Sequence, residues 1–131
     1  MKFTLDTYAW IEYLEGSNEG EKVREILEEG EQEIFTPSIV LAELSDAIIK
    51  GKVGINWNDL LKLIKIKTNI IFINEDIAKN AGIIKAELRK KHSGVGLIDC
   101  IILSISRAKK SVLITGDPHL TSESDVSNIN E

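Results

Sequence analysis

The chain has 131 residues, with 16 Lys and Arg against 21 Asp and Glu, and its formal net charge is −5. This length predicts one domain over residues 1–131, and the acidic balance excludes a simple cationic nucleic-acid binder, although not a nucleic-acid enzyme whose acidic centre is neutralised by a metal ion. No apolar run reaches the length of a membrane span, the N-terminus lacks a signal-peptide pattern, and the single cysteine cannot form an internal disulfide, so we expect a cytoplasmic protein with no membrane association.

The first half of the chain alternates short apolar runs with amphipathic segments. Thr36 and Pro37 form the clearest helix start, because a hydroxyl can cap the helix and proline suits its first turn. The expected elements, in order, are a strand over 2–5, a helix ending at Gly16, a helix from Ser17 or Asn18 to Glu29, a strand over 33–36 and a helix from Thr36-Pro37 to Lys50.

The second half continues the alternation. The run 70–73 is apolar throughout, as in a strand buried on both faces, and Asn74 is a suitable cap for the helix behind it. The expected elements are a helix over 56–67, a strand over 70–73, a helix from Asn74 to a basic segment at 89–94, a helix from Gly96, a strand over 111–115 and, at 126–129, a weak edge strand or a disordered end.

Strands that alternate with helices imply parallel pairing through right-handed crossovers. The sequence therefore predicts an α/β fold of three layers, α/β/α, with a parallel sheet of four or five strands.

Asp99 stands alone inside the long apolar run 96–105. At helical spacing it shares a face with Ile102, Leu103 and Ser106, so its side chain should point inward from a helix buried nearly all round. An unpaired buried carboxylate is costly, and the chain has few arginines that could neutralise it, which favours a cation or metal site over a merely structural Asp.

Three further carboxylates can reach the same place. Asp6 and Asp117 follow strands directly, and the carboxyl edge of an open parallel sheet is where ligands bind. On the helix after Pro37, Glu43 lies at the edge of the buried arc, whereas Asp46 lies nearly opposite its centre. Four carboxylates in one cleft would repel unless cations arrived, and oxygen ligands suit Mg²⁺ or Mn²⁺, which can activate water and stabilise the charge on a phosphodiester.

Each acid also has a simpler interpretation. Asp6 and Asp117 could cap the segments that follow them, and Glu43 could be a boundary residue whose carboxylate reaches water. His119 is interpreted as a surface or capping residue, and no Cys/His spacing predicts zinc.

Together, Leu5-Asp6-Thr7, Glu43 within 37–44, Gly96-Leu97-Ile98-Asp99 and Thr115-Gly116-Asp117 resemble the PIN-domain nucleases, most closely the small VapC-type toxins of prokaryotic toxin–antitoxin pairs. The resemblance covers nearly the whole chain in order and spacing. It implies a PIN-like fold and a ribonuclease that uses Mg²⁺ or Mn²⁺. By position, Asp6, Glu43 and Asp99 would be the core metal ligands and Asp117 a more variable fourth, with hydroxyls of Thr7 and Thr115 supporting the carboxylates or a bound water.

The resemblance also implies partners: an RNA substrate, a small antitoxin that blocks the acidic cleft, and a second copy in a homodimer. For RNA the chain offers a cationic segment beside the Asp99 helix, which could equally be a solvated helix end: Lys85, Arg89, Lys90, Lys91 and His92.

Rival functions remain open from the residues. An RNA-processing PIN nuclease without an antitoxin would carry the same acids, and a binding-only relative would keep the fold without the chemistry. A receiver-like signalling domain also gathers carboxylates and magnesium at the strand edge, but it would require a Lys after a late strand, where this chain has Thr115-Gly116-Asp117.

Overall fold

The computed structural model describes all residues, 1–131. One five-stranded sheet runs through the molecule in the order β3-β2-β1-β4-β5, and every neighbouring pair is parallel. Its strands are β1 (Lys2–Leu5), β2 (Glu33–Pro37), β3 (Asn69–Ile71), β4 (Val112–Thr115) and β5 (Val126–Asn128). The helices are α1 (Thr7–Glu15), α2 (Asn18–Glu28), α3 (Ser38–Ile49), α4 (Trp57–Lys67), α5 (Glu75–Leu88) and α6 (Leu97–Ala108).

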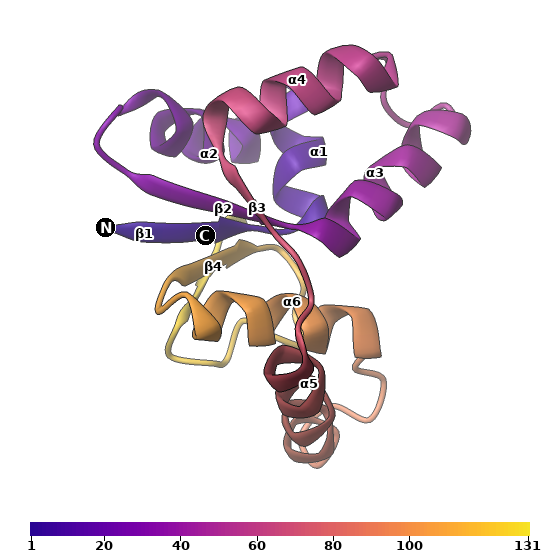
Figure 1. Ribbon diagram of the computed structural model, residues 1–131, viewed down its shortest axis with the longest axis vertical. Helices are drawn as coiled ribbons and strands as arrows, with labels where there is room; N and C mark the ends of the chain where they lie inside the picture. The colour runs from indigo at the N-terminus through magenta and orange to yellow at the C-terminus, as the bar shows by residue number, and fades with distance from the viewer.

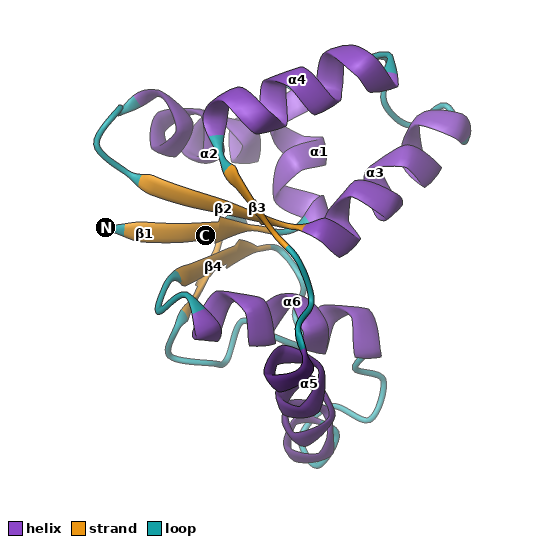
Figure 2. Ribbon diagram, in the orientation of Figure 1, coloured by secondary structure: helices purple, strands orange, loops and turns teal.

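The helices form a layer on each side of the sheet (Figure 1; Figure 2). The chain moves from β1 through β2 to β3 in one direction, which places α1–α4 on one face. It then reverses to β4 on the other side of β1, which places α5 and α6 on the opposite face. The predicted three-layer α/β fold is confirmed, and the larger of the two strand numbers is the correct one.

The reversal of direction fixes where a ligand can bind. In an open α/β sheet the crevice lies beyond the carboxyl ends of the strands at which the order switches. Here those strands are the neighbours β1 and β4, paired with Leu5 beside Ile114. Asp6 follows β1 directly, and Asp117 lies two residues after β4.

Trp10 anchors the core beneath α1. Its side chain is fully buried, and Nε1 donates to Thr36 Oγ1 at 3.2 Å. The Thr36 hydroxyl also contacts that of Thr68 at 2.8 Å, which ties β2 to the end of α4. Thr36 is therefore a strand residue and not the predicted helix cap: α3 begins at Ser38, and Pro37 in the cap position makes no side-chain cap bond.

The prediction that 70–73 is a strand buried on both faces is wrong. β3 ends at Ile71 and lies at the edge of the sheet, and Phe72 beyond it is 71% exposed. The chain leaves the sheet after Ile71 to reach the opposite face, so Phe72 has no neighbouring strand to cover it. Asn74 does cap α5, accepting from the Ile77 amide at 2.9 Å.

Helix α6 is also less buried than predicted. Residues 102–106 are buried, but Leu97 and Ile98 in its first turn are 48% and 41% exposed. Cys100 is fully buried, as expected of a small apolar side chain, and burial raises the pKa of its thiol.

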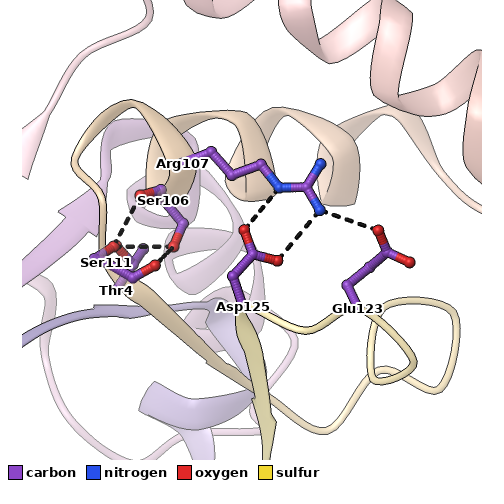
Figure 3. A network of polar contacts seen from close by, with 6 residues as sticks. All are labelled: Thr4, Ser106, Arg107, Ser111, Glu123 and Asp125. Carbon is purple, nitrogen blue, oxygen red and sulfur yellow. Dashed lines mark hydrogen bonds and ion pairs between the residues drawn. The ribbon is translucent and has the colours of Figure 1, made fainter.

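Two groups of hydrogen-bonded polar side chains lie at the C-terminal end of α6 (Figure 3). Buried hydroxyls of Thr4 and Ser111 lie 2.6 Å apart, and Ser106 Oγ lies 2.9 Å from Ser111 Oγ. Arg107 donates through Nε to Asp125 at 2.8 Å and through a terminal nitrogen to Glu123 at 3.0 Å. These contacts fix the loop that leads into β5, so the last segment is a strand and not a disordered end.

Candidate active site

A cleft of about 370 Å³ lies beyond the carboxyl ends of β1 and β4. It contains the four predicted acids and no Lys, Arg or His. The residues that line it are Asp6, Thr7, Tyr8, Glu43, Asp99, Ile102, Gly116, Asp117 and Pro118. A second cavity, about 330 Å³ between α5 and α6, has Glu87 and Arg107 in its lining and so shows no excess of one charge.

Asp6 is held at the start of α1, where it is only 6% exposed. Its Oδ1 accepts from the Ala9 amide at 2.8 Å, so the capping interpretation is correct and does not conflict with a place in the cleft. Burial raises the pKa of Asp6 to about 7, and repulsion by Asp117 and Glu43 adds to the rise, whereas hydrogen bonds from Thr115 and Ala9 oppose it.

Asp99 approaches from the opposite layer, in the first turn of α6. It is half-buried in the cleft wall, as the helical spacing predicted. Its pKa is raised to about 7, first by burial, then by its hydrogen bond with Asp117 and by repulsion from the other acids.

Asp117 is oriented by its own turn. Its Oδ1 accepts from the His119 amide at 2.9 Å and lies 3.1 Å from His119 Nδ1, and its amide donates to Thr115 Oγ1 at 3.0 Å. Thr115 is fully buried below the cleft, outside its lining. The predicted capping role of His119 is incomplete, because the imidazole also lies against an acid of the cleft.

Glu43 and Asp46 separate as the helical phase predicted. Glu43 lines the cleft and accepts from the Thr7 hydroxyl at 2.5 Å. Asp46, one turn further along α3, pairs with Lys50 at 2.9 Å, and its side chain is 62% exposed.

Comparison with known proteins decides the family. The model of the PIN domain matches residues 3–122, which is nearly the whole chain.

The chain belongs to the PIN domain family.

Solved structures of similar fold agree with this assignment. VapBC2 from Rickettsia felis, bound to a DNA fragment from its promoter, is 23% identical with a TM-score of 0.76, and the match covers 98% of both chains. VapBC-1 from nontypeable Haemophilus influenzae is 22% identical with a TM-score of 0.67 over 100% of both chains. VapC20 of Mycobacterium tuberculosis, described as a sarcin-ricin loop cleaving toxin, is 14% identical with a TM-score of 0.61, covering 82% of this chain and 83% of that one. No curated protein matches the chain.

The donor chemistry of this PIN domain fits a hard divalent ion. Four carboxylates offer oxygen atoms, the ligand type that such an ion prefers, and burial first and mutual repulsion after it raise the pKa values of Asp6 and Asp99. As the side chains lie, no three His, Cys, Asp or Glu residues form a group that could hold an ion. Thr7 donates to one oxygen of Glu43 and the Ala9 amide to one oxygen of Asp6, which fixes the direction in which each carboxylate points.

None of the residues predicted to contact RNA through a positive charge lines the cleft. Lys85 is half-buried on α5, Arg89 is exposed at the end of that helix, and Lys91 lies 3.9 Å from Glu123. The ring of His92 packs edge-on against His119, which in turn contacts Asp117. Thr7, whose hydroxyl was expected to support the carboxylates, does line the cleft.

Sequence reasoning missed four lining residues. The place of Tyr8 at the rim depends on contacts with Gly116 and Asn130, which no local pattern signals. Ile102, Gly116 and Pro118 line the cleft because their neighbours Asp99 and Asp117 do. None of the helices combines the length and the hydropathy that crossing a membrane requires.

Proposed function

We propose that this PIN domain is a divalent-metal-dependent endoribonuclease that hydrolyses RNA phosphodiester bonds in the acidic cleft. The observation that carries the proposal is the convergence of four carboxylates, from both helical layers and both central strands, at the strand edge where α/β folds bind ligands. Two of these acids have pKa values raised to about 7, a perturbation typical of functional sites.

Asp6, Glu43, Asp99 and Asp117 would hold Mg²⁺ or Mn²⁺. When bound, such an ion lowers the pKa of a coordinated water and stabilises the negative charge that develops on a phosphodiester. The supporting groups come from this chain: Thr7 donates to Glu43, Thr115 hydrogen-bonds Asp6 and accepts from the amide of Asp117, and the turn at His119 fixes one oxygen of Asp117. They hold the carboxylates in place before substrate arrives.

The biological role we propose is that of the toxin in a toxin–antitoxin pair. Similar folds occur in structures described as VapBC, and one is described as a toxin–antitoxin complex from Klebsiella pneumoniae. We propose a small antitoxin as the partner, a homodimer as the assembly and the cytoplasm as the location. Ile49 and Ile66 leave apolar side chains in water that a protein partner could cover.

The strand order argues against the receiver-like alternative. Receiver domains of the flavodoxin-like type have the order 2-1-3-4-5, whereas this sheet has the order 3-2-1-4-5. An RNA-processing PIN nuclease without an antitoxin is the remaining alternative for the biological role.

The test is incubation of the purified protein with end-labelled RNA in Mn²⁺, in Mg²⁺ and in EDTA. We expect cleavage with either metal and none in EDTA or with Asp99→Asn. Metal-independent cleavage, or none under any condition, would contradict the proposal. For the biological role, growth arrest on expression that is relieved by co-expressing an adjacent short open reading frame supports a toxin, whereas harmless expression of active enzyme supports RNA processing.

A further inference from the structure

Tyr8 is an aromatic side chain at the rim of the acidic cleft. It lies in the first turn of α1, two residues after Asp6, and is 37% exposed. It is the one aromatic residue among those that line the cleft. No other aromatic ring stacks on it, since the ring pairs of this chain are Trp10 with Tyr13 and His92 with His119.

One face of the Tyr8 ring rests on the backbone at Gly116. A Cβ built there would lie 2.3 Å from Cε1, 2.7 Å from Cδ1 and 2.9 Å from Cζ of the ring. Three similar distances to consecutive ring atoms place that Cβ over the face of the ring, because an approach in the ring plane would leave the outer two atoms much farther away. Only glycine at position 116 allows the ring to lie flat here.

The hydroxyl end of Tyr8 is fixed as well. It donates to Asn130 Oδ1 at 3.1 Å. Asn130 in turn is held by its own amide, which donates to Asn128 Oδ1 at 2.9 Å, and its side-chain nitrogen lies 3.5 Å from Gly116 O. The ring is therefore oriented between the ends of β4 and β5 before any ligand binds.

The charge of the cleft determines what such a ring could do. In the metal-free cleft four carboxylates repel RNA phosphates, and no cationic side chain lines the cleft to hold the rest of a nucleotide. A nucleobase, however, is planar and uncharged, and it stacks well on an oriented aromatic ring whatever its sequence.

We propose that Tyr8 is a base-stacking platform, and that the cleft takes an unpaired nucleotide whose base lies on the exposed face of its ring. The inference rests on the proposed nuclease function and names the residue that would orient the substrate base. A base within a duplex is already stacked and cannot reach the ring. Tyr8 is thus a substrate-positioning residue.

The test compares Tyr8→Leu, Tyr8→Phe and Tyr8→Trp. KM and kcat are measured on a labelled single-stranded RNA in Mn²⁺, and Kd is measured by fluorescence anisotropy in the silent Asp99→Asn background with Mg²⁺. Loss of one base–aromatic stack predicts a rise of about 5- to 150-fold in KM and in Kd for Tyr8→Leu, with a smaller change in kcat. Tyr8→Phe and Tyr8→Trp, which keep a ring, should recover most of that loss. Phe72→Leu, which removes an exposed ring outside the cleft, is the matched control and should leave KM unchanged.

The variants separate stacking from a purely structural tether. If Tyr8 served only to hold Asn130 through its hydroxyl, Tyr8→Phe would behave like Tyr8→Leu, and Asn130→Ala would reproduce both; that result overturns the proposal. Melting temperatures of all variants show whether a rise in KM accompanies unfolding.

Measurements on single-stranded and duplex RNA distinguish the stacking inference from the proposed nuclease function. The same RNA annealed to its complement should bind wild type and Tyr8→Leu equally weakly, and tighter duplex binding that depends on Tyr8 overturns the stacking inference. Wild-type cleavage with an unchanged KM in Tyr8→Leu overturns stacking and leaves the nuclease intact. Absence of both RNA binding and cleavage in the wild type overturns both proposals. Loss of binding to a protein partner, with RNA affinity retained, would reassign the ring to protein docking.

Discussion

The two ends of helix α6 differ in whether their carboxylates are paired with a cation. At its first turn Asp99 lies among three other carboxylates, and its pKa is raised to about 7. At its last turn Arg107 lies between Glu123 and Asp125, and the guanidinium lowers the pKa of Asp125 (Figure 3). The first end gathers carboxylates with no cationic side chain in the cleft lining, whereas the second is internally neutralised and therefore stabilises the fold.

A cluster of like charges lowers the stability of the metal-free chain, as functional sites often do. The ion pairs of Arg107, by contrast, need no ligand to be favourable. A variant at the first end should consequently lower activity without lowering stability. A variant at the second end should lower stability without lowering activity.

The largest effect is expected at the cleft end of the helix. Asp99→Asn keeps the shape of the side chain and removes one of the four carboxylates that line the cleft. We expect RNA cleavage to fall by about 100- to 1000-fold, because one of the groups that hold the metal and the developing charge is lost. The metal-free protein should be as stable as wild type or more so.

Cleavage rates in Mn²⁺ and urea unfolding in EDTA measure the two quantities. If Asp99→Asn is clearly less stable without metal and still cleaves RNA, then Asp99 stabilises the fold, as Arg107 does, and is not needed for cleavage.

The next effect concerns pH and the buried Asp6. Its pKa is about 7 in the folded chain and 3.8 as the ordinary value, so the unfolded chain loses its proton first as pH rises. The contribution of Asp6 to the stability of the metal-free fold should therefore be most favourable below pH 4, be lost between about pH 4 and 7, and level off above. Asp6→Asn, which still caps α1, should recover on the order of a few kcal/mol at pH 8 and almost nothing at pH 4.

Urea unfolding in EDTA at several pH values tests this dependence, and repetition in Mn²⁺ supplies the control. Because metal and proton compete for the same oxygens, Mn²⁺ should stabilise the wild type more at pH 8 than at pH 5. The expectation would be contradicted if metal-free stability rose from pH 4 to 7 and rose as much in Asp6→Asn. The negative charge of the acids would then be balanced by groups outside the cleft lining.

A smaller effect of opposite kind is expected at the other end of α6. Arg107→Met keeps the length of the side chain and leaves Glu123 and Asp125 without their cation. We expect a loss of about 1–2 kcal/mol at pH 7, reduced from the value for buried charged hydrogen bonds because Arg107 is partly exposed. The lowered pKa of Asp125 means that this stabilisation is present above pH 4 and disappears as pH falls through the folded value, so wild type and variant should converge in acid.

Thermal unfolding at pH 7 and at acid pH measures the loss, and cleavage per folded molecule serves as the control. Arg107 lies outside the cleft, so the rate in Mn²⁺ should match wild type. If Arg107→Met is almost fully folded and still cleaves RNA more slowly than wild type, Arg107 acts in the site.

Local sequence signals predicted the parts of this molecule that depend on neighbours in the chain. Asp6 and Asp117 could be placed because each follows a strand, and Asn74 because it precedes an amphipathic helix. The inward position of Glu43 followed from helical phase alone.

The errors came from contacts that are distant in sequence. The hydroxyl of Thr36 is satisfied by Thr68, which lies 32 residues later, so it was not available as a cap. Phe72 is exposed because β3 forms the sheet edge. The apolar run alone does not predict the order of the strands in the sheet. The orientation of the Tyr8 ring depends on Asn130, 122 residues away. Periodicity reports only which face a residue is on, and the partner on that face is set by topology.

The smallest effect sharpens the comparison within one helix. Asp46 lies on α3 one turn from Glu43 but faces water, and its pair with Lys50 is an exposed i, i+4 interaction. Such pairs contribute about 0.3–0.5 kcal/mol, so Asp46→Asn should change the free energy of unfolding by no more than that, less still at high salt, and should leave RNA cleavage unchanged. Glu43→Gln, the matched variant, removes a charge from the cleft and should abolish most cleavage while sparing the metal-free fold. Steady-state cleavage in Mn²⁺ and urea unfolding in EDTA of both variants decide between them. Equal losses of activity would show that net negative charge near the cleft matters and that the direction of the carboxylate does not, which would remove the geometric basis for a metal site built from these four acids.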